Sequence, residues 1–114
     1  MAFKLSKLTQ SVHSGSKGDP LHGGIVNPIY PSSAYDYEAG VIYPRYYNTP
    51  NQKAVAEKLC ALENAESGMI FSSGMAAILT SLFAILKKDD HIIFQNDLYG
   101  GTHHAALNEL EKYG

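Results

Sequence analysis

The chain has 114 residues, enough for one domain, with 45% hydrophobic residues and a formal charge of −2. Its charges form no long run of one sign, which argues against a nucleic-acid or membrane-surface partner and favours a small ligand. No apolar stretch approaches the roughly 20 residues that cross a bilayer, and residues 1–8 lack the apolar region of a signal peptide. We therefore expect a cytoplasmic protein with no membrane partner.

Cysteine and histidine usage argues against a metal site. Cys60 is the single cysteine, which excludes an internal disulfide bond and a multi-cysteine metal centre. The five histidines follow none of the spacings that place two ligands on one face of an element. We predict no metal, and we expect Cys60 to be a small buried residue rather than a reactive thiol.

Residues 1–49 are rich in glycine and proline and show no lasting apolar periodicity. Six tyrosines lie in this part, and they carry too much apolar area for a solvated linker. We predict that residues 1–49 form an extended, irregular arm that contacts a neighbouring subunit. Within it, residues 15–18 lack the spacing of a phosphate loop, and we interpret them as a flexible turn.

Regular structure is predicted to begin at Thr49. Thr49 is a hydroxyl N-cap, Pro50 occupies the first helical position, and Gln52 follows the cap by three residues. This capping-box pattern predicts a helix over 50–64. Its apolar stripe consists of Val55, Leu59 and Leu62.

Short apolar runs alternate with helical patterns in the rest of the chain. The pattern predicts strands at 69–71 and 91–94, and helices over 74–86 and 102–113. Helix, strand, helix, strand, helix is the order of an α/β fold. Two short strands and a helix that is apolar nearly all round need neighbours, so we expect residues 50–114 to be the incomplete beginning of a larger α/β domain.

The turn from the first predicted strand into the next helix is a candidate anion site. It passes through Ser72, Ser73 and Gly74, and the first N–H groups of a helix lie at the positive end of its dipole without intrahelical acceptors. The serine hydroxyls add donors, and Gly74 permits a close approach. An ordinary helix N-cap has the same composition, so this turn alone identifies no ligand.

Three motifs together suggest a family: Tyr43-Pro44-Arg45, Ser73-Gly74-Met75 and Tyr99-Gly100-Gly101-Thr102. Their order and spacing resemble the Cys/Met-metabolism group of pyridoxal-phosphate enzymes. This transsulfuration family includes cystathionine γ-synthases, cystathionine lyases, methionine γ-lyases and O-acylhomoserine sulfhydrylases. The resemblance covers about residues 9–114 and only the first part of a family member. It implies the fold-type-I transferase-like α/β fold of these enzymes.

The resemblance also implies roles for residues of the last two motifs. Ser73, Gly74 and Met75 bind the phosphate of pyridoxal 5'-phosphate, with backbone N–H groups offered by Gly74 and Met75. Tyr99 stacks on the pyridine ring, and its hydroxyl is a candidate catalytic proton-transfer group.

The arm motif is implied to act in another subunit. Tyr43 and Arg45 reach into a neighbouring active site and bind its cofactor phosphate. A helix terminus contributes roughly 0.3–1 kcal/mol, whereas a charge-assisted hydrogen bond contributes roughly 1.5–3 kcal/mol. The phosphate dianion therefore needs the Arg45 guanidinium. Asn48-Thr49-Pro50 departs from the Asn-Pro-Thr of many relatives, without touching Tyr43 or Arg45.

The implied function is transsulfuration of sulfur-containing or homoserine-derived amino acids by β- or γ-elimination or γ-replacement, within methionine and cysteine metabolism. We expect a homo-oligomer, a tetramer built from two dimers whose subunits share active sites. The sequence does not separate synthase from lyase. The family's Schiff-base lysine and pyridinium-binding aspartate lie beyond residue 114, so we expect this segment alone to be inactive. A truncated interaction fragment and an independent anion-binding module stay open as alternatives.

Overall fold

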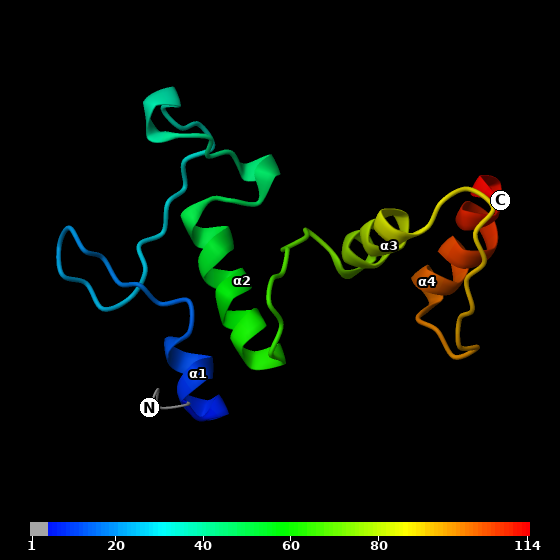
Figure 1. The fold of residues 1–114 in the computed structure, drawn as a ribbon, viewed down its shortest axis with the longest axis horizontal. Helices are drawn as coiled ribbons and strands as arrows, with labels where there is room; N and C mark the ends of the chain where they lie inside the picture. Colours follow the sequence, from blue (N-terminus) through cyan, green and yellow to red (C-terminus); the bar gives the residue numbers. More distant parts are fainter. Residues whose placement is uncertain (1–4) are drawn as a thin grey trace. The chain divides into compact units, whose positions relative to one another are not determined.

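The computed structural model describes residues 5–114, which divide between Ile70 and Phe71 into two compact units (Figure 1). The first unit holds helices α1 (Lys7–His13) and α2 (Pro50–Glu63) and the short 3-10 helices η1 (Tyr37–Ala39) and η2 (Pro44–Tyr46). The second unit holds α3 (Gly74–Ile85) and α4 (Gly100–His104), and α4 continues into η3 (Ala105–Glu109) and η4 (Leu110–Tyr113). None of the helices within residues 5–114 has both the length and the apolar character needed to cross a membrane.

Helix α1 is an element that the sequence analysis missed, because it treated residues 1–49 as irregular throughout. The Ser6 hydroxyl caps this helix by accepting a hydrogen bond from the Thr9 N–H at 3.2 Å. A serine N-cap was therefore visible in the sequence. The helix has only seven residues and no buried side chain, so its apolar pattern is too short to be recognised.

Helix α2 confirms the predicted capping box. The Gln52 side chain accepts the Thr49 N–H at 3.2 Å, and Pro50 is the first helical residue. Asn64 ends the helix in the left-handed region at φ 57°, a conformation that asparagine tolerates better than most residues. Cys60, expected to be buried, is only half-buried on this helix.

Lysines bind α1 and α2 to each other in an antiparallel arrangement (Figure 1). The Lys7 ammonium, at the start of α1, donates to the carbonyl of Ala61 at 2.9 Å and to that of Leu62 at the end of α2. The Lys58 ammonium of α2 donates to the Val12 carbonyl, near the end of α1, at 3.1 Å. Each helix thus receives a cation at its C-terminal carbonyls, where the helix dipole favours positive charge.

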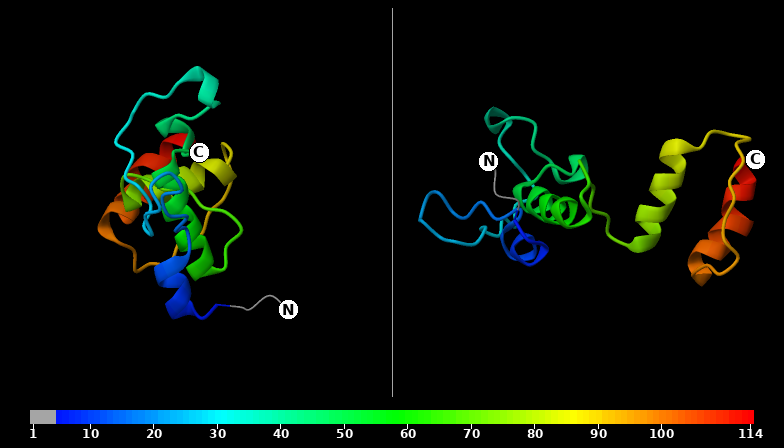
Figure 2. Two further views of the ribbon diagram at one scale, coloured as in Figure 1. Left: turned by 90° about the vertical axis from the view of Figure 1, so that its left-hand side faces the viewer. Right: turned by 60° about the horizontal axis from the view of Figure 1, so that its bottom comes forward.

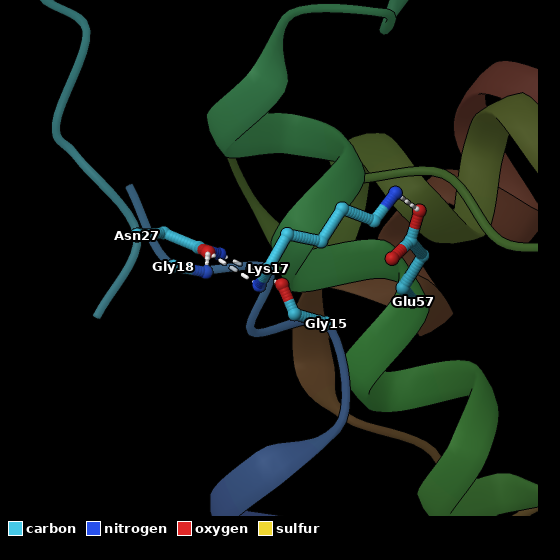
Figure 3. A network of polar contacts seen from close by, with 5 residues as sticks. All are labelled: Gly15, Lys17, Gly18, Asn27 and Glu57. Atoms are coloured by element: carbon cyan, nitrogen blue, oxygen red, sulfur yellow. Dashed lines mark hydrogen bonds and ion pairs between the residues drawn. The ribbon is translucent and has the colours of Figure 1, made fainter. Parts of the chain in front are cut away.

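Asn27 closes the turn at residues 15–18, which the sequence analysis interpreted as a flexible turn (Figure 3). Its side-chain oxygen accepts the N–H groups of Lys17 at 2.7 Å and Gly18 at 3.1 Å, and its amide donates to the Gly15 carbonyl at 2.7 Å. The Lys17 ammonium also pairs with Glu57 of α2 at 2.8 Å. The turn is therefore fixed at both ends rather than free.

Asn51, in the first turn of α2, holds a second part of the arm in the same way. Its side-chain oxygen accepts the Tyr30 N–H at 2.8 Å, and its amide donates to the Pro28 carbonyl at 2.9 Å. The apolar side chains around this segment stay more than three-quarters exposed: Leu21, Ile25, Val26 and Ile29. Contact of the arm with a neighbouring subunit stays a prediction, and so does a domain boundary at residue 49.

The second unit contains both predicted C-terminal helices (Figure 2). Helix α3 follows the predicted range of 74–86 to within one residue. The helix predicted over 102–113 begins two residues earlier, at Gly100, and changes pitch through the π-helical segment η3 before ending at Tyr113. The rings of Phe83 and Tyr113 meet nearly edge-on, with centroids 5.3 Å apart.

The two predicted strands are not formed. Residues 69–71 and 91–94 carry no strand structure, and the one backbone bridge within residues 5–114 joins Asp19 and Gly24. A strand exists only when a second segment accepts and donates its hydrogen bonds, and residues 5–114 supply no such partner. Helix α3 has no buried residue, and Phe83 on it is 49% exposed. Its predicted burial in a larger body is not tested by this structure.

The arm turn makes a testable prediction through two glycines. Gly15 and Gly23 both have φ near +70°, but a Cβ on Gly15 would lie 2.1 Å from the Ala54 carbonyl oxygen, whereas one on Gly23 meets nothing within 4 Å. Gly23→Ala carries only the left-handed penalty of about 1–2 kcal/mol. We expect Gly15→Ala to cost about 1–3 kcal/mol more, because it also overpacks the contact with α2.

Hydrogen–deuterium exchange of the full-length protein measures this difference. The amides of Lys17 and Gly18, which donate to Asn27, should exchange faster in Gly15→Ala than in Gly23→Ala. Equal protection of these amides in the two variants would contradict the close packing of Gly15 on α2.

Candidate functional site

Ser73 is the N-cap of helix α3 and lies in the turn that is predicted to bind an anion. Its hydroxyl oxygen accepts the Ala76 N–H at 3.1 Å, and its carbonyl accepts the Ala77 N–H at 3.1 Å. Ser73 is therefore an N-cap, as the alternative interpretation of this turn predicted. The cap uses the Ser73 oxygen only as an acceptor, so its hydroxyl hydrogen stays able to donate to a ligand.

Gly74 and Met75 form the first turn of the same helix. Helical geometry gives their N–H groups no intrahelical acceptor, and it places them at the positive end of the α3 dipole. The space where a Gly74 side chain would stand is open, with no atom within 4 Å of a Cβ there. No neighbouring atom therefore crowds this side of the Gly74 backbone.

Tyr99 is the N-cap residue of α4, so this helix begins before its predicted start at residue 102. Its carbonyl accepts the N–H groups of Thr102 at 2.9 Å and His103 at 3.0 Å. The side chain is 75% exposed. Its ring turns back over Gly101, since a Cβ on that glycine would lie 2.9 Å from Cε1 of Tyr99. The ring is thus placed locally but open to a ligand.

Thr102 links the two motifs of the second unit. It is one of the few buried residues within 5–114, at 7% exposure, and its hydroxyl donates to the Met75 sulfur at 3.6 Å. Met75 and Tyr99, both predicted as site residues, therefore contact the same turn of α4. This contact could not be predicted from the sequence, because a threonine after two glycines is equally typical of a helix start.

The Tyr43-Pro44-Arg45 motif belongs to the first unit, where two amide side chains hold its backbone. The Tyr43 N–H donates to the Asn48 side-chain oxygen at 2.8 Å, and Gln52 donates to the Pro44 carbonyl at 3.0 Å. Asn48 also donates to the Val41 carbonyl at 2.6 Å. The departure noted at residues 48–50 therefore keeps an asparagine that shapes this motif.

The side chains of this motif are available to a ligand. Arg45 is exposed, and within residues 5–114 its guanidinium makes no hydrogen bond or ion pair. Tyr43 is 41% exposed and its ring lies 5.6 Å from that of Tyr46, tilted by 57°. An unpaired guanidinium on a fixed turn is suited to bind an anion with two parallel hydrogen bonds.

Charge pairs elsewhere perturb two carboxyl groups. The His22 side chain, 2.9 Å from Asp19, holds the pKa of that carboxyl below its ordinary value. The Lys112 ammonium, 2.7 Å from Glu109, lowers the pKa of Glu109. Neither carboxyl belongs to the predicted site. No group of three potential metal ligands occurs in the part of the chain that the structure describes.

Comparison with known proteins gives a consistent set of relatives. The Cys/Met metabolism PLP-dependent enzyme family matches residues 8–114. Cystathionine gamma-synthase/O-acetylhomoserine (thiol)-lyase of Bacillus subtilis is 40% identical over 111 residues, 93% of this chain and 29% of its own length. Cystathionine gamma-lyase of the same organism is 35% identical over 96% of this chain and 30% of its own length. L-methionine gamma-lyase of Fusobacterium nucleatum is 34% identical over 100% of this chain and 32% of its own length.

A solved structure agrees with these relatives. Cystathionine gamma-lyase from Lactobacillus plantarum, in complex with L-serine, superposes with a TM-score of 0.85 at 33% identity. The match covers 96% of this chain and 29% of that one. The predicted α/β class is confirmed by this likeness, and the missing strands follow from the small share of the fold that the chain contains. The chain spans about 30% of the length of the relatives it matches.

The cap on α3 makes a second prediction. Ser73→Ala removes the acceptor for the Ala76 N–H and should cost about 1 kcal/mol, or about a fivefold rise in local opening. Amide exchange at Ala76 in the full-length protein measures it. Ser81→Ala is the control, because Ser81 lies inside α3 and donates to the Ala77 carbonyl at 2.8 Å without capping the helix. A Ser73→Ala effect no larger than that of Ser81→Ala would show that the cap is not needed.

Proposed function

Because the chain belongs to the Cys/Met metabolism family of PLP-dependent enzymes, we propose that the full-length protein binds pyridoxal phosphate and transforms sulfur-containing or homoserine-derived amino acids. The reaction class is β- or γ-elimination or γ-replacement, as the names of the lyase and synthase relatives suggest. One observation from the structure carries the proposal. The N-terminus of α3 and the Tyr99 ring both meet the first turn of α4, so an anion site and an aromatic surface lie in one compact unit.

The turn at Ser73, Gly74 and Met75 fits a phosphate group. Backbone N–H groups, a free hydroxyl hydrogen and open space at Gly74 are the features that a phosphate at a helix N-terminus requires. We assign the cofactor phosphate to this turn. The helix terminus contributes about 0.3–1 kcal/mol, too little by itself to hold a dianion out of water.

Arg45 and Tyr43 supply the remaining phosphate contacts in this proposal, and they do so for a neighbouring subunit. The support is the exposed, unpaired guanidinium on a turn fixed by Asn48 and Gln52. A planar guanidinium can donate two parallel hydrogen bonds to phosphate oxygens, each roughly 1.5–3 kcal/mol. The active sites are then shared between subunits of a homo-oligomer, which we propose to be a cytoplasmic tetramer built from two dimers.

Tyr99 has two tasks in the proposed site. When bound, pyridoxal phosphate supplies an electron sink for negative charge that develops on the substrate carbon. The Tyr99 ring is proposed to stack on the pyridine face and hold it in place. Its hydroxyl stands on the substrate side and can take or return a proton there, as a general base or acid.

A complementation experiment tests the shared site. Arg45→Ala is co-expressed with a variant that lacks the cofactor-binding lysine of the complete enzyme. About a quarter of wild-type activity should return, because random assembly makes half of the dimers hybrid and each hybrid has one intact site. Each variant alone should be inactive or nearly so.

Arg45→Lys in the same experiment separates charge from geometry. It keeps the positive charge but loses the planar fork, so it should bind cofactor less tightly than wild type and more tightly than Arg45→Ala.

In the complementation experiment, absence of recovered activity in verified hybrid oligomers would exclude a contribution of Arg45 across the subunit interface.

Tyr99→Phe tests the catalytic proposal. It keeps the ring and removes the hydroxyl, so cofactor absorbance and the thermal midpoint should stay near wild type. The turnover number should fall by a factor of about 10² to 10⁴, the usual contribution of a proton-transfer group. Tyr37→Phe, at a residue 99% exposed in the arm, is the matched control. Unchanged turnover in Tyr99→Phe would remove this residue from the chemistry.

A further inference from the structure

We propose that Gly101 and Thr102 are positioning residues of the cofactor site. Gly101 leaves room for the Tyr99 ring and the Met75 sulfur beside its Cα, and Thr102 holds Met75 through its hydroxyl. The first turn of α4 thereby sets the Tyr99 ring and the N-terminus of α3 relative to each other. This inference rests on the proposed function and assigns a role to two residues to which that proposal gives no direct contact with substrate or cofactor.

The requirement at Gly101 is one of space. Its φ is not in the left-handed region, so an alanine could adopt its backbone conformation. A Cβ at this position would lie 2.9 Å from Cε1 of Tyr99 and 3.2 Å from the Met75 sulfur. Both distances are shorter than ordinary van der Waals contact, so at least one of the two side chains has to move. The adjacent Gly100 has no atom within 4 Å of its Cβ position.

Thr102 bonds to both motifs at once. Its N–H donates to the Tyr99 carbonyl at 2.9 Å, and its hydroxyl donates to the Met75 sulfur at 3.6 Å. A thioether is a weak acceptor, but the threonine is 93% buried, which limits competition from water for this bond. The residue therefore ties the backbone that carries the Tyr99 ring to the side chain of the proposed phosphate turn.

The geometry of the ligand explains why such a link matters. In pyridoxal phosphate the phosphate and the ring are joined covalently, so a protein must present its anion site and its stacking surface at one fixed separation. A displacement of about 1 Å in a positioning contact can change a rate by about a hundredfold. A rigid link between the two surfaces is the way to keep this separation.

Gly101→Ala and Gly100→Ala form the first test in the full-length protein. The Tyr99 side chain is exposed and can swing away from an added methyl group, so Gly101→Ala should keep its thermal midpoint. It should change the visible circular dichroism of bound pyridoxal phosphate and weaken cofactor binding by about tenfold to a hundredfold. Gly100→Ala should match wild type in both measurements.

Thr102→Val and Thr102→Ser form the second test. Its main measurement is the NMR spectrum of the protein without cofactor. With methionine methyl groups labelled by ¹³C, Thr102→Val should shift the Met75 resonance, while Thr102→Ser keeps the hydroxyl and should stay close to wild type. The Met69 resonance is the internal control, and Met75→Leu assigns the signal. Thr80→Val, at an exposed threonine of α3, should shift neither resonance. Cofactor binding should weaken by about twofold to tenfold in Thr102→Val.

The outcomes separate this inference from the proposed function. If the wild-type protein binds no pyridoxal phosphate, the proposed function is wrong and the inference falls with it. If wild type binds the cofactor but Gly101→Ala behaves like Gly100→Ala, the inference alone is wrong. An unchanged Met75 resonance in Thr102→Val overturns it as well, even if Gly101→Ala fails to fold.

Discussion

Backbone polar groups that have no sheet partner determine how this chain is held together. Among the described residues Ala105 is the one buried hydrophobic side chain, so burial of apolar area stabilises little here. Side chains satisfy the backbone instead. Lys7 and Lys58 bind the ends of α2 and α1, Asn27 and Asn51 hold the arm, and Ser73 caps α3. Each such group would cost free energy if it were buried without a partner in the complete protein.

The candidate site consists of the polar groups that this pattern leaves open. The N–H groups of Gly74 and Met75 have no intrahelical acceptor, and Arg45 has no counter-ion within residues 5–114. The same physical feature therefore explains the fold and the function. Where the chain supplies its own acceptor or donor, it builds structure, and where it supplies none, a phosphate group completes the bonding in the proposed enzyme.

Local sequence patterns were enough to predict most of the α-helices. They predicted none of the contacts between segments that lie far apart in the sequence. The capping box at Thr49 and Gln52 is a short-range pattern, so α2 was predicted to within one residue. The motifs around Tyr43, Ser73 and Tyr99 were visible because their residue types are unusual together. The hydrogen bond from Asn27 to Gly15 joins residues 12 positions apart, and the contact from Thr102 to Met75 joins residues 27 positions apart. No periodicity in the sequence predicts either of them. The prediction of two strands was wrong for a related reason, since a strand depends on hydrogen-bonding partners in other segments.

The bond from Lys7 to the end of α2 has a consequence for synthesis on the ribosome. Its acceptor, the Leu62 carbonyl, lies 55 positions later in the chain. At about 5–20 residues per second, the ribosome needs about 3–11 s to add those residues after Lys7. For most of this interval the ribosome is making the arm itself, so α1 exists before the helix that it packs against. Chaperones that act on nascent chains can therefore meet the exposed apolar side chains of the arm before Ser73 or Tyr99 has been made.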